Sequence, residues 1–232
     1  MLKDIEIRQL TTMEEMKEVQ RIEETVWKMS PTPVHLTFTA SQNGGIVLGA
    51  FLKSKMIGFL YSFAGFKENS PYLCSHMLGI LPEYRKGGLG MQMKMKQGEI
   101  AKNMGYKMIT WTFDPLESLN AYLNIQKLGA VGASYKENHY GEMSDQLNQG
   151  LPTDRILIEW NLNEPNEFRH LPFHLEKVLL QTRKDMPYLH EELIEDISHN
   201  DGPWFVAIPE NFQHIKMNDI ELAKKWRHET RR

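Results

Sequence analysis

Hydrophobic positions in the first half of the chain switch between the two-residue spacing of strands and the wider spacing of helices. Residues 5–10 alternate as an edge strand does. The next segment carries apolar residues on one face of an amphipathic helix, at Met16, Val19, Ile22 and Val26. The pattern thus predicts an edge strand, a helix, a short helix within a loop, a β-hairpin and a strand, at residues 5–10, 11–27, 30–45, 46–63 and 72–80.

The middle of the chain has the order strand, glycine-rich loop, helix and strand. Strand 72–80 precedes the loop, a helix follows it, and residues 106–113 form a second buried strand. A strand, a helix and a strand imply a right-handed crossover, so we expect the two strands to be parallel neighbours. A helix over 114–128 and strands at 130–135 and 155–162 complete a mixed α/β sheet.

From about residue 163 the composition becomes more polar, and we expect a C-terminal extension of helices and one strand. Apolar spacing predicts helices around 175–179 and 187–197, and a last helix that the pair Asn218-Asp219 caps. The apolar residues 204–208 form a strand too short to bury itself. We therefore expect this strand to pair with the main sheet.

Length and composition are those of a globular protein. The chain has 232 residues, of which 41% are hydrophobic and 25% are charged, so it can bury a sizeable core. We expect residues 1–165 to form that core and residues 166–232 to form the extension, packed on it. The single cysteine, Cys74, excludes an internal disulfide and is expected to be a buried, inert thiol.

Charge and apolar runs exclude two classes of partner. The net charge is −3, which counts against a nucleic-acid binder, because such proteins usually carry a strong basic excess. No segment approaches the ~20 apolar residues of a membrane span, so we expect a cytoplasmic protein without a membrane partner. The sequence is compatible with an oligomer.

The loop between the central strand and helix is basic and rich in glycine. Arg85 and Lys86 supply full positive charges, while Gly88 and Gly90 allow a ligand to approach the backbone N–H groups closely. Such a loop at a helix N-terminus favours a phosphate. It is no P-loop, because no Lys-Ser or Lys-Thr pair follows Gly90, and it lacks the third glycine of a dinucleotide fingerprint. An ordinary strand-to-helix turn is the alternative.

The pattern Arg85-x-x-Gly88-x-Gly90 after a strand resembles the acyl-CoA pyrophosphate loop of the GNAT acetyltransferase superfamily. Residues 120–130 are similar to the superfamily's next motif, and the resemblance covers residues 4–162. A bacterial GNAT subgroup with a C-terminal extension is similar at residues 111–116, 140–141 and 151–155. The resemblance implies the GNAT acyl-CoA N-acyltransferase fold.

The resemblance also implies acetyl-CoA or another acyl-CoA as cofactor, and no metal. It assigns cofactor binding to the end of the strand and the loop, at Met77, Leu78, Gly79, Ile80, Arg85, Lys86, Gly87, Gly88, Leu89 and Gly90. Ser118 and Asn120, at the start of the next helix, are expected to bind the pantetheine arm. Ile125 stands where many members have a tyrosine that protonates the departing thiolate. Tyr122, one turn earlier, is the candidate substitute.

An amine must lose a proton before it attacks a thioester, so the reaction needs a base or a chain of waters. His76 shares strand parity with Leu78 and Ile80, and the ordinary pKa of histidine suits the task. A core histidine bonded to the backbone is the alternative. Glu23, on the first helix, is a second candidate base, although such residues more often form a solvated face.

An amino-acid acceptor would offer a carboxylate, which an arginine can bind through two N–H donors. Arg155, which follows a turn into a strand, and Arg227, on the last helix, are the candidates for this contact. Either arginine could instead form a structural pair or lie in solvent.

The sequence therefore predicts direct transfer of an acetyl, succinyl or other acyl group from CoA to a primary amine, such as an amino acid. One rival is a GNAT-like module that binds acyl-CoA as a sensor or scaffold without turnover, which the isoleucine at position 125 keeps open. A second rival is a protein N-acetyltransferase, which would need an open groove for its peptide. The acceptor and the acyl chain stay open at this stage.

Overall fold

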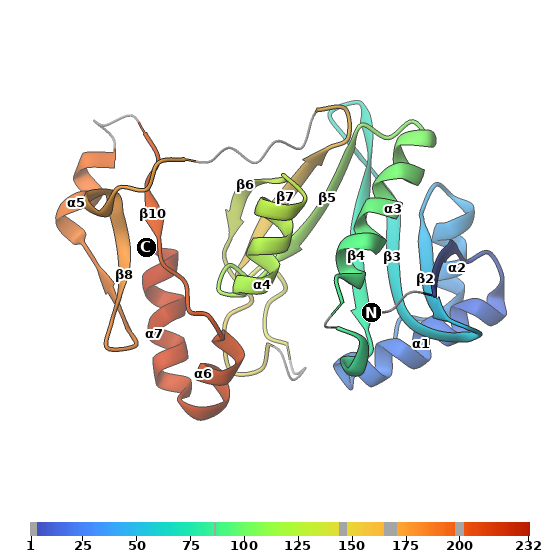
Figure 1. Cartoon of the computed structure of the whole chain (residues 1–232), viewed down its shortest axis with the longest axis horizontal. Helices are drawn as coiled ribbons and strands as arrows, with labels where there is room; N and C mark the ends of the chain where they lie inside the picture. Colours follow the sequence, from blue (N-terminus) through green and yellow to red (C-terminus); the bar gives the residue numbers. More distant parts are fainter. Residues whose placement is uncertain (1–3, 86, 144–147, 165–170, 198–201) are drawn as a thin grey trace.

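The computed structural model describes the chain except for residues 1–3, 86, 144–147, 165–170 and 198–201. Its centre is a seven-stranded sheet in the order β1-β2-β3-β4-β5-β7-β6 (Figure 1). β4 and β5 are parallel, and the other neighbours are antiparallel. The strands are β1 Ile5–Gln9, β2 Val47–Leu52, β3 Lys55–Lys67, β4 Ser70–Ile80, β5 Met108–Phe113, β6 Val131–Lys136 and β7 Arg155–Asn161. The predicted mixed α/β sheet is confirmed.

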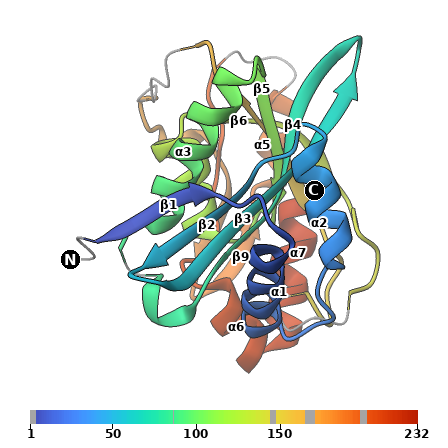
Figure 2. The same ribbon diagram turned by 90° about the vertical axis from the view of Figure 1, so that its right-hand side faces the viewer.

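Helices cover both faces of this sheet (Figures 1 and 2). On one face, α1 (Met13–Trp27) and α2 (Val34–Gln42) pack over β3. On the other face lie α3 (Leu89–Asn103) and α4 (Ser118–Ala121), which continues as a π-helix, Tyr122–Lys127. Each face of the sheet therefore has its own apolar cluster, one under α1 and one under α3.

The extension forms a small sheet of its own. β8 (Val178–Arg183) pairs with β9 (Met186–Leu189) as a hairpin and with β10 (Phe205–Val206) in parallel. The expectation that residues 204–208 join the main sheet is therefore wrong. The physical reason is that β8 offers the short strand a nearer partner within the extension.

Of the helices predicted in the extension, the one around residues 175–179 is wrong and the one at 187–197 is correct only in part. The segment around residues 175–179 enters a strand, because Val178 and Leu180 are buried with the period of two that a strand requires. Of the predicted helix 187–197, only α5, Glu191–Ile197, is helical. Short 3₁₀ turns lie at Pro82–Tyr84 and Leu175–Lys177.

A third apolar cluster joins the extension to the rest of the molecule. Trp226 is 1% exposed and belongs to one cluster with Phe212 of the extension and with Leu116 and Leu151, which lie before residue 163. The extension's last helices are α6, Phe212–Asn218, and α7, Ile220–Arg231. The boundary predicted between residues 165 and 166 lies outside the described residues.

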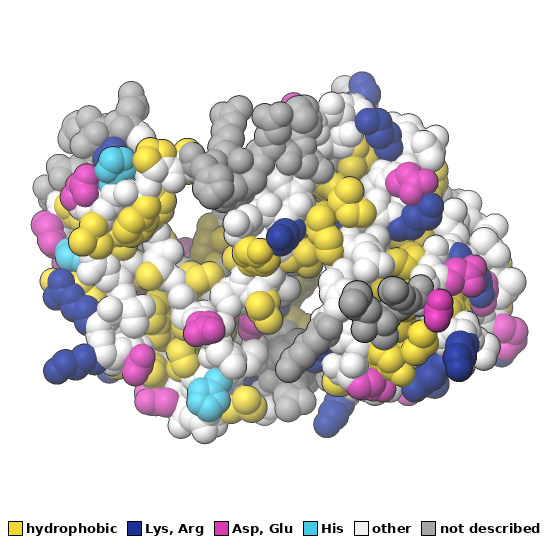
Figure 3. Space-filling view, viewed as in Figure 1, with side chains coloured by type: hydrophobic (Ala, Val, Ile, Leu, Met, Phe, Trp, Pro, Cys, Tyr) yellow, Lys and Arg dark blue, Asp and Glu magenta, His cyan; other side chains and the backbone are white. Residues whose placement is uncertain are grey.

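The outer surface of the extension carries exposed hydrophobic side chains over its small sheet (Figure 3). Phe173, Leu175 and Val206 are the exposed members of this surface. None of the helices in the described part of the chain is both long and apolar enough to cross a membrane.

Candidate functional site

Strands β4 and β5 pair only briefly and then part. They are in register at Leu73 with Ile109 and at Cys74 with Thr110, after which β4 continues to Ile80. Beyond these pairs, no further pairing joins the two strands in the described chain. The carboxyl-terminal half of β4 therefore has backbone groups on its β5 side that an extended ligand can reach.

A bulge lies in β4 at the start of this opening. Tyr61 of β3 is opposite Met77, whereas its neighbour Ser62 is opposite Ser75. His76 is therefore the extra residue, with no partner on β3. An extra residue shifts the alternation of side chains by one, so residues on either side of the bulge change face.

The bulge places His76 on the face of the sheet that α1 covers. Its ring lies 5.9 Å from the ring of Tyr61 and 5.7 Å from that of Phe63. Leu78 and Ile80 pack instead in the cluster under α3, so the predicted shared parity of His76 with these two residues is wrong. The side chain of His76 is exposed, yet its apolar surroundings lower the imidazole pKa below the usual 6.5 through desolvation.

Glu23 lies on the same face as His76. Its side chain is buried, and one carboxylate oxygen accepts hydrogen bonds from the Thr32 backbone N–H at 3.0 Å and the Thr32 hydroxyl at 2.9 Å. The other oxygen has no hydrogen-bond partner among the described residues. Burial raises the pKa of Glu23, and its charge helps to raise the pKa of Tyr61, whose ring contacts His76.

The glycine-rich loop leaves the N-terminus of α3 open. Gly88 adopts a left-handed backbone, φ +73°, and forms the N-cap without a side-chain hydrogen bond. A Cβ built at Gly88 would meet no atom within 4 Å, so the surroundings of this residue are open. Arg85 is exposed, and its Nε donates to the Ile80 carbonyl at 3.0 Å. Lys86 lies outside the described residues.

The helix after β5 is held by the extension. The Ser118 hydroxyl donates to the Glu210 carbonyl at 2.6 Å, while Asn120 is exposed. Tyr122 is 48% exposed, and the Lys127 ammonium lies 5.2 Å from its ring centroid. Ile125 packs against the apolar cluster under α3.

The residue of the site that the sequence did not reveal is Lys94. Its side chain, only 4% exposed, reaches from α3 to the point where the strands part. Lys94 Nζ donates to the Ser75 hydroxyl of β4 at 2.8 Å and lies 3.8 Å from the ring centroid of Trp111 of β5. Burial lowers its pKa from 10.5 to about 7, and the Cys74 thiol acts weakly in the opposite direction.

A glutamine completes this polar cluster. The Ser75 hydroxyl donates to Gln97 Oε1 at 3.1 Å. Gln97 is fully buried, and its Nε2 donor has no hydrogen-bond partner among the described residues. The cluster of Lys94, Ser75 and Gln97 thus has more donors than acceptors, which favours an incoming acceptor atom.

The two arginines predicted to hold an acceptor lie near the end of β5, and both have partners within this chain. Arg227 forms two hydrogen bonds with the Asp114 carboxylate, at 2.9 and 2.5 Å, and is 3% exposed. Arg155 donates to the Asp154 carbonyl at 2.8 Å and to the Asn148 side-chain oxygen at 2.7 Å. Their predicted role toward an acceptor carboxylate stays a prediction.

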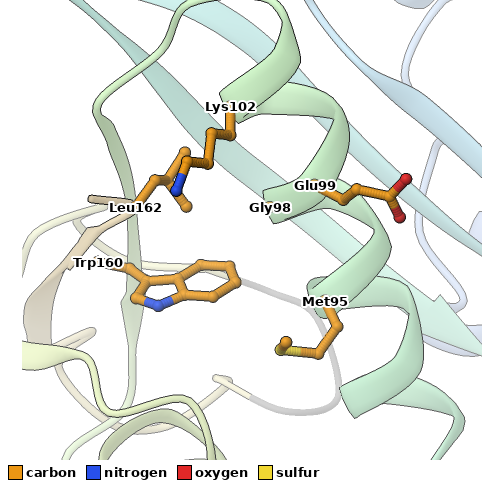
Figure 4. Close-up of a pocket in the computed structure, with 6 residues that line it drawn as sticks. All are labelled: Met95, Gly98, Glu99, Lys102, Trp160 and Leu162. Carbon is orange, nitrogen blue, oxygen red and sulfur yellow. The ribbon is translucent and has the colours of Figure 1, made fainter. Parts of the chain in front are cut away.

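A separate shallow pocket of about 200 Å³ lies between the carboxyl-terminal half of α3 and β7 (Figure 4). Trp160 forms its floor and packs so closely against Gly98 that a Cβ there would lie 2.6 Å from the indole ring. The pocket lies beside the far end of α3 from the glycine loop. Within the part of the chain that the structure describes, no group of three or more His, Cys, Asp and Glu residues could hold a metal.

Comparison of the sequence with protein-family models and with curated proteins finds no match. The fold, however, is similar to solved acetyltransferases. The ribosomal-protein-S18-alanine N-acetyltransferase of Escherichia coli superposes with a TM-score of 0.56 at 15% identity, over 73% of this chain and 99% of that one. An N-acetyltransferase of Staphylococcus aureus gives 0.56 at 15% identity, over 69% and 100%. The NatC complex bound to Gag peptide and CoA gives 0.55 at 15%, over 68% and 98%.

Proposed function

Because this chain has the fold of the GNAT acetyltransferases, we propose that it transfers an acyl group from an acyl-CoA to a primary amine. One observation carries the proposal: β4 and β5 part beside the uncapped N-terminus of α3. The opening offers strand backbone to an extended arm, and the helix N-terminus offers N–H groups to a pyrophosphate. A site for a simple phosphate would need only the helix N-terminus. CoA has both a pyrophosphate for the helix N-terminus and an extended pantetheine arm for the open strand.

The residues present fit coenzyme A. The backbone N–H groups of Leu89 and Gly90, with the Arg85 guanidinium, would hold the pyrophosphate, and the backbone of residues 75–80 would hold the arm. The neighbouring NatC structure was solved with CoA, which supports this cofactor. When bound, the acyl-CoA supplies the thioester carbonyl that an amine attacks.

His76 and Glu23 are the proposed bases. The lowered pKa of His76 keeps its imidazole neutral near pH 7, which is the form that accepts a proton from the acceptor's ammonium group. On the same face of the sheet, Glu23 has a buried carboxylate oxygen for which the described residues offer no hydrogen-bond partner. If His76 is the base, kcat/KM of the wild type falls only at a pH below 6.5. In His76→Gln this fall at acidic pH should be absent.

We place the acceptor on the α1 side of the sheet, where His76 and Glu23 lie, and we expect a small-molecule amine. The extension supports this choice over a peptide, because it covers the segment that follows β5. Its residues bind Asp114, Glu117 and Ser118. A peptide acceptor would need the carboxyl end of β5 to be open.

A thermal-shift panel tests the cofactor first, with acetyl-CoA, succinyl-CoA, CoA and ATP as ligands. We expect the CoA compounds to raise the melting temperature and ATP, which lacks the pantetheine arm, to leave it nearly unchanged. Equal shifts of the melting temperature with ATP and CoA would contradict the proposal that the pantetheine arm binds where β4 and β5 part.

Release of free CoA thiol in the presence of amine pools then tests turnover. Release that depends on an amine supports the transferase, and the active pool names the acceptor class. Stabilisation by acyl-CoA without thiol release from any amine or peptide pool would favour the sensor instead. Release with peptides alone would favour a protein N-acetyltransferase.

A further inference from the structure

The amino group of Lys94 lies on the α3 face of the sheet, beside the point where β4 and β5 part. The last paired residues of β4 and β5 are Cys74 and Thr110, so the next pair would be Ser75 and Trp111. Lys94 Nζ contacts these two residues, one on each strand, by a hydrogen bond to the first and over the ring of the second. The ammonium therefore lies beside the first residues of the two strands that no longer pair.

An arm that enters from the glycine loop ends at this point. A Cβ at Gly90 would lie 3.6 Å from Leu78 and 3.7 Å from Ile80, so the loop borders the open end of β4. From Ile80 to Ser75 the partners on β3 run from Gly58 to Ser62, so with the bulge at His76 the stretch is four residue steps long, about 13 Å at ~3.3 Å per residue. An extended pantetheine arm is of comparable length, so the sulfur would arrive beside Ser75 and Lys94.

The surroundings of Lys94 leave it able to give up a proton. Facing it are Ser75 from β4, Trp111 from β5 and Gln97 from α3, the Cys74 thiol acts on it only electrostatically, and no carboxylate in the described chain pairs with it. An ammonium without a counterion in a buried site is readily deprotonated. The Trp111 ring still favours the cation before the proton is transferred.

We propose that Lys94 is the acid that protonates the CoA sulfur, an inference that rests on the proposed acyl transfer. The amine nitrogen forms a bond to the thioester carbon, and the C–S bond breaks with its electron pair going to sulfur. Sulfur takes a proton from the Lys94 ammonium, which leaves CoA thiol and a neutral Lys94. The acceptor nitrogen loses two protons through the base to solvent, its ammonium proton before the attack and one N–H proton as the amide forms, and Lys94 regains one proton from solvent. One proton is released for each amide formed.

The relative acidities fit this direction of transfer. A thiol has an ordinary pKa near ~8.5, and the pKa of Lys94 is lowered to about 7, so the proton moves from the stronger acid to the weaker one. The sequence offered only Tyr122 for this role, and its exposed ring lies beside Lys127 on the helix surface.

The first experiment titrates the thiol of bound CoA by its ultraviolet absorbance, which needs no turnover. In the wild type the thiol and Lys94 should titrate as a coupled pair, because a thiolate holds the proton on Lys94, and the apparent thiol pKa should lie about one unit or more below that of free CoA. Lys94→Met should return the value to that of free CoA. Lys102→Met, which removes an exposed lysine of the same helix, should leave the thiol pKa unchanged.

The second experiment measures rates with an amine that supports turnover. Lys94→Met should lower kcat by about 10²–10⁴-fold, with little change in the KM for acyl-CoA. Lys94→Arg keeps the charge but holds its proton, so it should still lower the thiol pKa while kcat stays low.

The outcomes separate this inference from the proposed function. If the wild type binds no CoA or releases no thiol, acyl transfer itself is wrong. If it does both and Lys94→Met leaves kcat and the thiol pKa unchanged, only the role of Lys94 is overturned. A structural role would also overturn it, and would appear as equal weakening of CoA and acetyl-CoA in both Lys94 variants with a normal thiol pKa.

Discussion

Arg227 and Lys94 are both almost completely buried, and they differ in what compensates their charge. Arg227, at the contact between extension and core, is held by two hydrogen bonds to the Asp114 carboxylate. Lys94, at the split between β4 and β5, has a hydroxyl and an aromatic ring but no carboxylate. The pKa of Arg227 is raised by its acidic partners despite desolvation, whereas the pKa of Lys94 is lowered by desolvation.

The difference separates a charge with a carboxylate partner from a charge without one. A buried ion pair fixes two segments relative to each other, because breaking it leaves a charge without compensation. A buried cation without a counterion stabilises no contact of comparable strength and costs folding free energy. Its retention is easier to explain if an anionic group of a substrate or product lies beside it during the reaction.

Removal of the carboxylate in the first pair should have the largest effect on stability. Asp114→Asn keeps the shape and the hydrogen bond from the Leu116 N–H, but it removes the carboxylate that is hydrogen-bonded to Arg227 and leaves only the electrostatic influence of Asp154. We expect a loss of about 3–5 kcal/mol in the free energy of unfolding, measured in urea. The control is Glu191→Gln, which removes the exposed partner of Arg232 and should cost under ~1 kcal/mol. Similar losses in the two variants would contradict the structural importance of the buried pair.

Removal of the second cation should have the opposite sign. In the unfolded chain Lys94 titrates near ~10.4, and in the folded protein near 7, so burying the charged form destabilises the fold fully below pH 7. This cost declines as the pH rises from 7 toward 10.4, where both states become neutral. Lys94→Met should therefore stabilise by roughly 2–4 kcal/mol at pH 6, and by progressively less up to pH 10.

Thermal unfolding of the two proteins across this range measures the difference. A gain that does not depend on pH would show that better packing of methionine, not the removed charge, explains it. A loss of stability at every pH would show that the bonds of Lys94 to Ser75 and Trp111 outweigh its desolvation.

The sequence predicted the parts of the site that depend on local order. The glycine loop, the crossover and the parallel strands follow from neighbouring residues, since a strand, a turn and a helix have few ways to connect. Lys94 was missed because lysine on a helix ordinarily lies in solvent. Its neighbours Met93 and Gln97 also lie on the buried face of α3. The polar and aromatic partners of Lys94 come from β4 and β5, which are distant in sequence.

Two other features could not be predicted from spacing. The bulge at His76 inverts the alternation of side chains between the two faces of the sheet. No residue type in the sequence marks the position of this bulge. In the extension, the segment beginning at Val178 has apolar residues that suit a helix turn or a strand equally well. Its pairing with β9 and β10 depends on contacts distant in sequence.

The proposed pyrophosphate site can be tested with two matched glycines of α3. Gly88 and Gly105 flank the helix, both have positive φ, and a Cβ at either would meet no atom within 4 Å. Replacing either by valine should cost ~1–2 kcal/mol of intrinsic stability through backbone strain. Only Gly88→Val should also lose the ligand effect, about 2.7 kcal/mol at a CoA concentration of 100 times Kd. Unchanged CoA binding by Gly88→Val would place the pyrophosphate elsewhere.

The smallest effect should come from Arg155, whose environment lies between those of Lys94 and Arg227. It bonds two neutral oxygens and lies 3.9 Å from Asp114, so its charge is less completely compensated than that of Arg227. If Arg155 holds an acceptor carboxylate, Arg155→Lys should raise the KM for that acceptor about 10-fold, or ~1.4 kcal/mol, since lysine lacks the planar fork. The KM for acyl-CoA should barely change. Equal rises in the two KM values, or better activity on amines without a carboxylate, would show that Arg155 only supports the end of β7.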